Sequence, residues 1–252
     1  MSSNVRYNNA STSYQIAEAE VRNALQHPPM PPSELLENLY LFLTPQHLRR
    51  VFFFYELYQR VLTVPGSIVQ FGVRWGRDLA LFDSLRTTFE PFNHGRRIVG
   101  FDTFDGFPEV DDQDGMRPMV RRGNFATKDG YRVELEAFLR SREALSPLGH
   151  LQKFDLVEGD ANETLEAYLT EHPETVVALA HFDMDLYRPT RRCLELLRQH
   201  VTKGSIIVLD ELACREFPGE TVALREVFGL RHIRLERHPQ VNPTWPAFFV
   251  VE

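Results

Sequence analysis

The chain has 252 residues, of which 43% are hydrophobic and 25% are charged, values that are typical of a globular protein with a substantial core. The net charge is −7 and the basic residues are scattered, so a nucleic-acid-binding surface is not expected. No stretch approaches the roughly 20 consecutive apolar residues of a membrane span, and the two cysteines, Cys193 and Cys214, fit a reducing compartment. We therefore expect a cytoplasmic protein that acts on a small molecule, with no membrane or nucleic-acid partner.

The first part of the chain predicts two helices that precede the main domain. One covers about 13–27 and ends at the prolines of "HPPMPP", which lack an amide donor. The other covers about 45–63, where apolar side chains recur at three- and four-residue spacing. We assign residues 1–64 to an N-terminal helical extension and residues 65–252 to the main domain.

From residue 65 onward, apolar strands alternate with helical segments, a pattern that indicates a parallel sheet covered on both faces. The last two strand-like segments, "RHIRLERH" and "PAFFVVE", are separated by a short loop, which indicates antiparallel neighbours. The expected fold is an α/β three-layer sandwich with a mostly parallel sheet and a C-terminal antiparallel hairpin, which is the sheet plan of class I methyltransferases. The expected parallel strands are 67–72, 96–102, 154–160, 175–183 and 205–211, and the intervening helices are about 77–89, 129–141, 162–171 and 189–200.

Acidic residues stand at the carboxyl ends of two of these strands. Asp183 and Asp185 follow the fourth strand, and Asp210 and Glu211 follow the fifth, with one helix between them. Carboxyl ends of neighbouring parallel strands lie at one edge, so the four carboxylates would repel one another unless a cation lies among them. Oxygen ligands without a thiolate or imidazole cluster favour Mg²⁺ before Ca²⁺ or Mn²⁺. The alternative is that one or two of these acids point into solvent or cap the following helix.

The other strand ends carry residues that suit an adenosine-containing ligand. Gly72 and Gly76 flank a tight turn, where a ligand can approach the main chain, although an ordinary turn glycine is the alternative. Asp102 is placed to accept hydrogen bonds from ribose hydroxyl groups, or else it is a helix cap or a solvated loop acid. Asp160 and Ala161 can face an adenine edge, although Asp160 can also cap the next helix. The absence of G-x-G-x-x-G disfavours an NAD-dependent dehydrogenase.

Several of these segments together resemble the macrocin O-methyltransferase (TylF/MycF) family of sugar O-methyltransferases. The resemblance covers about residues 44–228 and is carried by "VPGSIVQFGVRWGRD", "FDTFDGFPE", "DMDLYRPT", "GSIIVLDE" and "FPGETVALREVF". It implies a class I methyltransferase fold of the Rossmann-like kind, with S-adenosylmethionine and Mg²⁺ or a similar divalent cation as cofactors. It also implies that the acceptor is a hydroxyl group of a deoxysugar, on a glycosylated antibiotic such as a macrolide or on its nucleotide-sugar precursor. The N-terminal helices of such proteins help to cover the substrate and join subunits into homodimers or larger homo-oligomers.

Carried over by position, the resemblance assigns roles to individual residues. Asp183, Asp210 and Glu211 would hold the cation, with Asp185 as a fourth candidate. For the catalytic base we favour Asp183, with Asp185 as the alternative; His181 is a rival base, although we expect it to be a satisfied core residue. The expected cofactor-binding residues are Phe71, Gly72, Val73, Gly76, Asp102, Thr103, Gly159, Asp160, Ala161 and Asp183.

The sequence also departs from the family pattern. Gln70 stands where an acid is usual, "VRWGRD" replaces a tryptophan–arginine–double-glycine run, and Glu211 replaces a second aspartate. Residues 109–152 match poorly and are expected to shape the acceptor pocket. Two other functions stay open: a catechol-type O-methyltransferase, which uses the same chelation on an aromatic diol, and a module that binds S-adenosylmethionine without catalysis.

Overall fold

The computed structural model describes residues 11–238 and 246–252. After Phe52 the chain divides into two compact units. The first contains α1 (Thr12–Gln26), the short 3-10 helices η1 (Pro32–Glu34) and η2 (Leu39–Phe42), and the start of α2 (Pro45–Val61). The second unit begins inside α2, earlier than the boundary that we expected at residue 64. The reason is that the second half of this helix is part of the core, where Phe53, Phe54, Leu57, Tyr58 and Val61 are all buried.

The second unit is built on one seven-stranded sheet with the strand order β3-β2-β1-β4-β5-β7-β6. The first five strands are parallel, β7 is antiparallel to β5, and β6 is antiparallel to β7. The predicted fold class is therefore confirmed. The strands are β1 (Ser67–Phe71), β2 (Ile98–Asp102), β3 (Phe154–Glu158), β4 (Val177–Phe182), β5 (Val201–Leu209), β6 (Glu236–Arg237) and β7 (Ala247–Val250).

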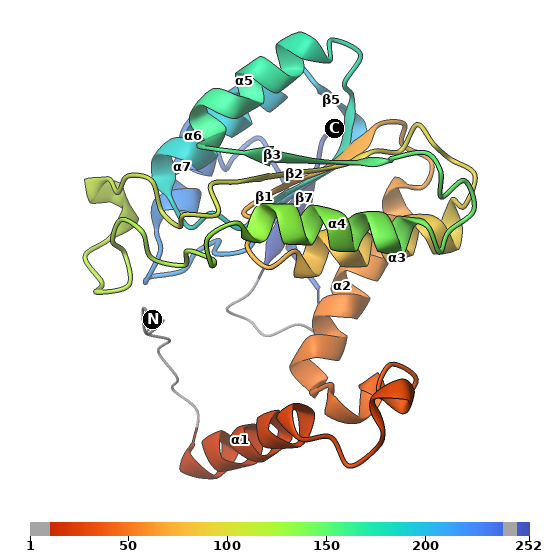
Figure 1. Ribbon diagram of the computed structural model, residues 1–252. Coiled ribbons are helices and arrows are strands. Elements are labelled where there is room, and N and C mark those ends of the chain that lie inside the picture. Colours follow the sequence, from red (N-terminus) through yellow and green to blue (C-terminus); the bar gives the residue numbers. More distant parts are fainter. Residues whose placement is uncertain (1–10, 239–245) are drawn as a thin grey trace. The chain divides into compact units, whose positions relative to one another are not determined.

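Helices cover both faces of the sheet (Figure 1). One face packs against the second half of α2 and against α3 (Arg77–Phe89) and α4 (Tyr131–Glu143), and the other against α5 (Ala161–Glu171), α6 (Tyr187–Leu197) and α7 (Gly219–Val227). Successive strand residues point to opposite faces, so Ile68 joins the first of these cores and Val69 the second. This explains why β1 and β4 are buried at every position rather than at alternate ones.

The C-terminal part differs from the prediction in two respects. Within the described residues, the segment "RHIRLERH" forms only a two-residue strand, Glu236–Arg237; of its two apolar side chains, Ile233 packs against the core and Leu235 is exposed. Helix α7 was not among the expected elements. The expected hairpin loop, 239–245, lies outside the described residues. No helix in the part of the chain that the structure describes has the length and apolar character of a membrane span.

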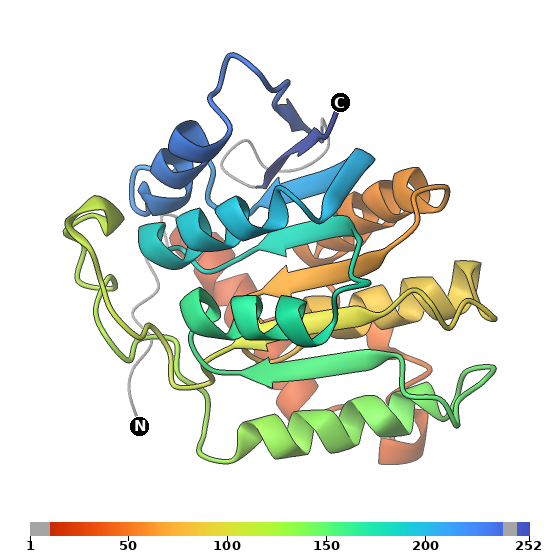
Figure 2. The same ribbon diagram turned by 90° about the horizontal axis from the view of Figure 1, so that it is seen from above.

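The carboxyl ends of the five parallel strands lie along one edge of the sheet (Figure 2). The yellow-green segment that follows β2, which contains the 3-10 helix η3 (Asp112–Asp114), lies at this edge together with the start of α7. The strand order reverses between β1 and β4. From β1 the chain continues to β2 and β3 on one side of the sheet, and from β4 it continues to β5 on the other side. In open α/β sheets, this reversal point is where ligands bind.

Candidate functional site

Three carboxylates from two neighbouring strands meet at this edge. β4 and β5 are paired in parallel register up to Phe182 and Leu209, and Asp183 and Asp210 are the next residues of each strand. Asp183, Asp210 and Glu211 each offer one oxygen atom, and these atoms all lie within 4.8 Å of one another. The structure therefore brings together the three residues that we expected to hold a cation.

A second group of carboxylates overlaps the first. Asp185 adopts a left-handed main-chain conformation (φ 62°) and lies with Glu211 and Glu220, again with oxygen atoms within 4.8 Å of one another. Asp185 was the fourth candidate ligand, whereas Glu220 was not predicted at all. Its only signal in the sequence is an acid in the first turn of a helix, a position where acids are common without any catalytic role.

The proximity of these acids shifts their protonation. Burial raises the pKa of Asp185 to about 7, and the neighbouring charge of Asp210 adds to this shift. The pKa values of Glu211 and Glu220 are raised well above their usual range, first by burial and then by the charge of Asp185. Like charges that are buried together disfavour ionisation, so a cation among them would stabilise the ionised forms.

The donor set fits a hard divalent cation. All the atoms of the first group are carboxylate oxygens, the ligands that Mg²⁺ prefers in proteins. Among the described residues, Oε2 of Glu211 is buried and has no hydrogen-bond partner, which a bound cation would supply. Arg77 pairs mainly with Asp78, with 2.9 Å between Nη2 and Oδ2, and makes a weaker contact of 4.0 Å with Oδ2 of Asp183.

His181 contacts the acidic group from inside the core. The side chain is fully buried, and its ring packs edge-on against Phe54 with 4.8 Å between the ring centroids. The Nε2 atom lies 3.2 Å from Oδ1 of Asp210. We expected a core histidine, and the structure adds the contact with Asp210. With its proton on Nε2, the imidazole would donate to this carboxylate and orient it.

Gly72 allows the main chains of β1 and β4 to approach closely at the site. It has a φ of +85°, and a Cβ atom at this position would lie 1.9 Å from the carbonyl oxygen of Asp183. Gly76 has a φ of +76°, and its Cβ would lie 2.5 Å from Cδ1 of Leu135. Gly72 is therefore required by the fold, whether or not a ligand also uses the space, whereas at Gly76 the end of the Leu135 side chain could move aside.

Replacing Gly72 with Ala is expected to lower the free energy of unfolding by about 2–5 kcal/mol, the sum of left-handed strain and overpacking. Gly130→Ala is a matched control, because Gly130 has a φ of +74° but no atom within 4 Å of a Cβ. The control should cost only the strain, about 1–2 kcal/mol. Urea denaturation of the two variants measures the difference, and equal losses would contradict the steric explanation.

Asp102 and Asp160 each bind main-chain amide groups. The carboxylate of Asp102 accepts hydrogen bonds from the N–H groups of Arg74 at 2.7 Å and Phe104 at 2.5 Å, and it thereby joins the turns after β1 and β2. Asp160 accepts from the N–H of Asn162 at 2.9 Å and is the N-cap of α5, as the capping alternative expected. A carboxylate has about four lone-pair positions, so both residues keep acceptor capacity for a ligand.

The remaining expected cofactor residues also lie along this edge, but some of them face the core. Phe71 stacks between Phe101 and Phe182, with ring centroids 5.2 and 4.7 Å apart, and Val73 is buried. A cofactor could therefore contact these two residues only through their main chain. Thr103 and Gly159 lie directly after β2 and β3, and Ala161 is the first residue of α5.

A small apolar cluster joins the segment after β2 to the loops that carry the acids. Phe107 of this segment packs with Leu186, which follows β4, and Phe217, which precedes α7. Asp114 is 1% exposed and accepts the N–H of Tyr187 at 2.5 Å. It thereby caps α6, whose own N-cap residue makes no side-chain hydrogen bond. Part of the 109–152 segment thus lies directly beside the turn after β4.

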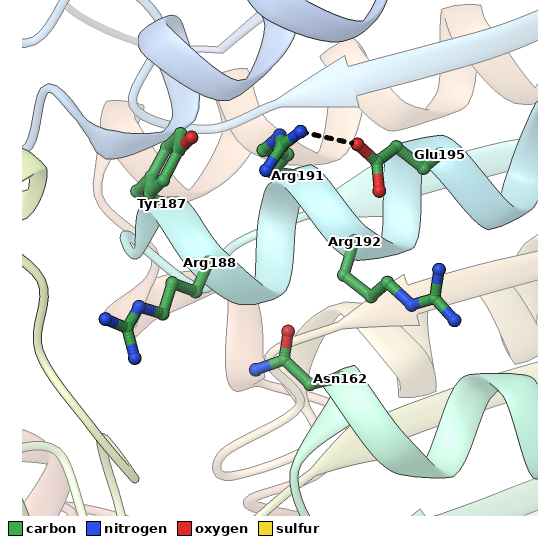
Figure 3. A pocket seen from close by; sticks show the side chains of 6 residues that line it. All are labelled: Asn162, Tyr187, Arg188, Arg191, Arg192 and Glu195. Carbon is green, nitrogen blue, oxygen red and sulfur yellow. Dashed lines mark ion pairs between the residues drawn. The ribbon is translucent and has the colours of Figure 1, made fainter.

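A surface hollow of about 420 Å³ lies between the starts of α5 and α6 (Figure 3). It contains none of the residues that we expected to bind the cofactor or the cation. Its arginines are paired with carboxylates: Arg191 with Glu195 at 3.1 Å, and Arg188 with Asp111 at 2.8 Å. Because its charges are already compensated within the chain, we assign it no role in the chemistry.

Comparisons with known proteins agree with the geometry. The model of the macrocin-O-methyltransferase (TylF) family matches residues 49–227. A crystal structure of CalS11, described as a calicheamicin methyltransferase, is 44% identical, covers 97% of this chain and 95% of that chain, and has a TM-score of 0.93. The apo structure of CalS11, described as a TDP-rhamnose 3′-O-methyltransferase, is 40% identical, covers 97% of each chain, and has a TM-score of 0.84.

The O-methyltransferase NovP shows the same fold at 21% identity, over 80% of this chain and 78% of that chain, with a TM-score of 0.62. The comparison with curated proteins gives no match. The family model spans well over half of the chain, and it includes the strands and turns that carry the acidic group. The chain therefore belongs to the macrocin-O-methyltransferase (TylF) family, as its motifs indicated.

Proposed function

We propose that this protein transfers the methyl group of S-adenosylmethionine to a hydroxyl group of a deoxysugar in antibiotic biosynthesis, with the help of Mg²⁺ or a similar divalent cation. The observation that carries the proposal is the meeting of Asp183, Asp210 and Glu211 within 4.8 Å, in a chain 44% identical to a calicheamicin methyltransferase. The description of CalS11 as acting on TDP-rhamnose favours a nucleotide-linked deoxysugar as the acceptor, ahead of a finished glycoside.

The chain's own residues would align the acceptor and accept its proton. A sugar hydroxyl is a weak nucleophile near neutral pH, so much of the rate must come from alignment and proton removal. A divalent cation on the three carboxylates would lower the pKa of a coordinated hydroxyl group and fix its position. Asp183 is our favoured base. Its main-chain N–H donates a hydrogen bond to the carbonyl oxygen of Phe71, which places Asp183 beside the glycine turn where the cofactor is expected. Asp185 is the alternative, because it lies two residues after Asp183 and its carboxylate lies within 4.8 Å of that of Glu211.

The test is a reaction of the purified protein with S-adenosylmethionine, MgCl₂ and TDP-rhamnose. Mass spectrometry should show a singly methylated sugar nucleotide and an equal amount of S-adenosylhomocysteine. Parallel reactions contain a macrolide glycoside or catechol as the acceptor. Product with catechol and none with either sugar would favour the catechol-type function. Calorimetric binding of S-adenosylmethionine without turnover of any acceptor would favour a binding module.

We also propose that residues 1–64 form a helical extension that helps to cover the substrate and joins subunits into a homodimer or larger homo-oligomer. Analytical ultracentrifugation compares the assembly states of the full chain and of a chain that starts at Thr44, which keeps the buried half of α2 in place. A full chain that sediments as a monomer at all concentrations would contradict this part of the proposal.

A further inference from the structure

Glu220 is an acidic side chain in a place where burial is costly. It lies in the first turn of α7 and is 0% exposed. The carboxylates of Asp185 and Glu211 lie within 4.8 Å of its own. An ionisable group buried beside like charges destabilises the fold unless specific contacts compensate for it.

Two main-chain hydrogen bonds provide such contacts. Oε1 of Glu220 accepts from the N–H of Asp185 at 3.3 Å, and Oε2 accepts from the N–H of Glu211 at 3.1 Å. One carboxylate therefore links the turn after β4 to the turn after β5. These are the two segments that carry the expected cation ligands.

The packing at the start of α7 holds Glu220 against both segments. A Cβ atom at Gly219 would lie 2.6 Å from the main-chain nitrogen of Tyr187 and 3.0 Å from the carbonyl oxygen of Asp185. Helix capping does not account for the acid, because the N-cap of α7 is Pro218, which has no side-chain cap bond. Both oxygens of Glu220 are instead directed at amides outside its own helix.

We propose that Glu220 is a positioning residue, which holds the main chains of Asp185 and Glu211 at the separation at which the neighbouring carboxylates can share one divalent cation. The inference rests on the proposed function, because it assumes the cation site. It adds a residue that acts through its two main-chain contacts and does not itself need to touch the cation or the acceptor.

The test measures cation binding directly, by calorimetric or electron-paramagnetic-resonance titration of the protein with Mn²⁺ alone. In Glu220→Gln, one of the two acceptor oxygens becomes an NH₂ group, which cannot accept from a main-chain N–H. The Kd for Mn²⁺ is expected to rise by about 10- to 100-fold, as is typical when a group that orients metal ligands is lost. The Kd for S-adenosylmethionine should stay unchanged. Glu220→Asp keeps two acceptor oxygens on a shorter side chain, so its Kd for Mn²⁺ should lie between that of the wild type and that of Glu220→Gln.

Glu143→Gln is the matched control. Glu143 is 2% exposed and accepts from the N–H of Lys153 at 3.0 and 3.1 Å, and it pairs with Arg86 at 3.0 Å, so it too is a buried acid bound to a main-chain amide. This variant should lose stability and keep the wild-type Kd for Mn²⁺. Should Glu220→Gln fail to fold, Glu220→Asp provides the same comparison. A folded Glu220 variant with wild-type Mn²⁺ affinity would overturn the positioning role alone, whereas wild-type protein that binds no Mn²⁺ would overturn the cation site itself.

Discussion

Asp210→Asn is expected to lower kcat/KM for methyl transfer by about 1,000-fold or more. The variant keeps the shape of the side chain but removes the charge of one of three oxygen donors that lie within 4.8 Å of one another. A metal ion that assists a reaction contributes several kcal/mol of transition-state stabilisation, and each 1.4 kcal/mol corresponds to a factor of about ten in rate. Asparagine also changes the contact with His181, whose Nε2 lies 3.2 Å from the carboxylate in the wild-type chain.

The measurement is the initial rate with TDP-rhamnose across a series of Mg²⁺ concentrations, together with the Kd for S-adenosylmethionine. The cofactor affinity should stay near that of the wild type, which separates a lost cation from a disrupted fold. Asp83→Asn is the matched control, because Asp83 is a buried aspartate that pairs with Arg86 at 2.8 Å, outside the acidic group. We expect its rate to stay near that of the wild type. Full activity of Asp210→Asn, or undiminished turnover of the wild-type protein after exhaustive EDTA treatment, would contradict the proposed role of the cation.

The convergence of Asp183 and Asp210 could be predicted from the sequence because it follows from two simple regularities. Each residue directly follows an apolar segment, and strands separated by one helix pair in parallel with their carboxyl ends at the same edge. The observed ends of β4 and β5, Phe182 and Leu209, lie within two residues of the expected ones. No knowledge of side-chain packing was needed for this part of the site.

Other features of the site depend on tertiary packing and had no local signal. Glu220 reaches Asp185 and Glu211 only because α7 packs against the turn after β4. Asp114 caps α6 from a distant part of the chain, within a segment that has little regular structure. The sequence identifies Gly72 as a turn glycine. The reason that no other residue fits, the nearby carbonyl group of Asp183, appears only when β1 and β4 are placed side by side. These contacts depend on how the helices and turns pack in three dimensions, so periodicity and spacing carry no information about them.

In the cation-free protein, the carboxyl group of Asp185 is expected to reduce the free energy of unfolding as the pH rises from about 4 to about 7, the opposite of the usual behaviour of a salt-bridged acid. Burial and the charge of Asp210 raise the pKa of Asp185 to about 7 in the folded protein, whereas an unfolded aspartate has a pKa of about 3.9. The folded state therefore binds more protons than the unfolded state in this range. One such proton makes the free energy of unfolding fall by up to about 1.4 kcal/mol per pH unit.

Urea denaturation in EDTA, at several pH values between about 4 and 8, measures this slope across the range of the shifted pKa. Asp185 faces the acids Asp210, Glu211, Asp114 and Glu220 and the base Arg74, so other titrations contribute to the total. Asp185→Asn isolates the carboxyl group of interest, because the stability difference between variant and wild type should grow in favour of the variant as the pH rises. Added Mg²⁺ should stabilise the wild type more at the upper end of the range than at the lower end, since cation binding requires ionised carboxylates. If the two proteins show the same pH profile in EDTA, Asp185 is not held in its neutral form by its surroundings, and the electrostatic argument for a cation at this edge of the sheet loses its main support.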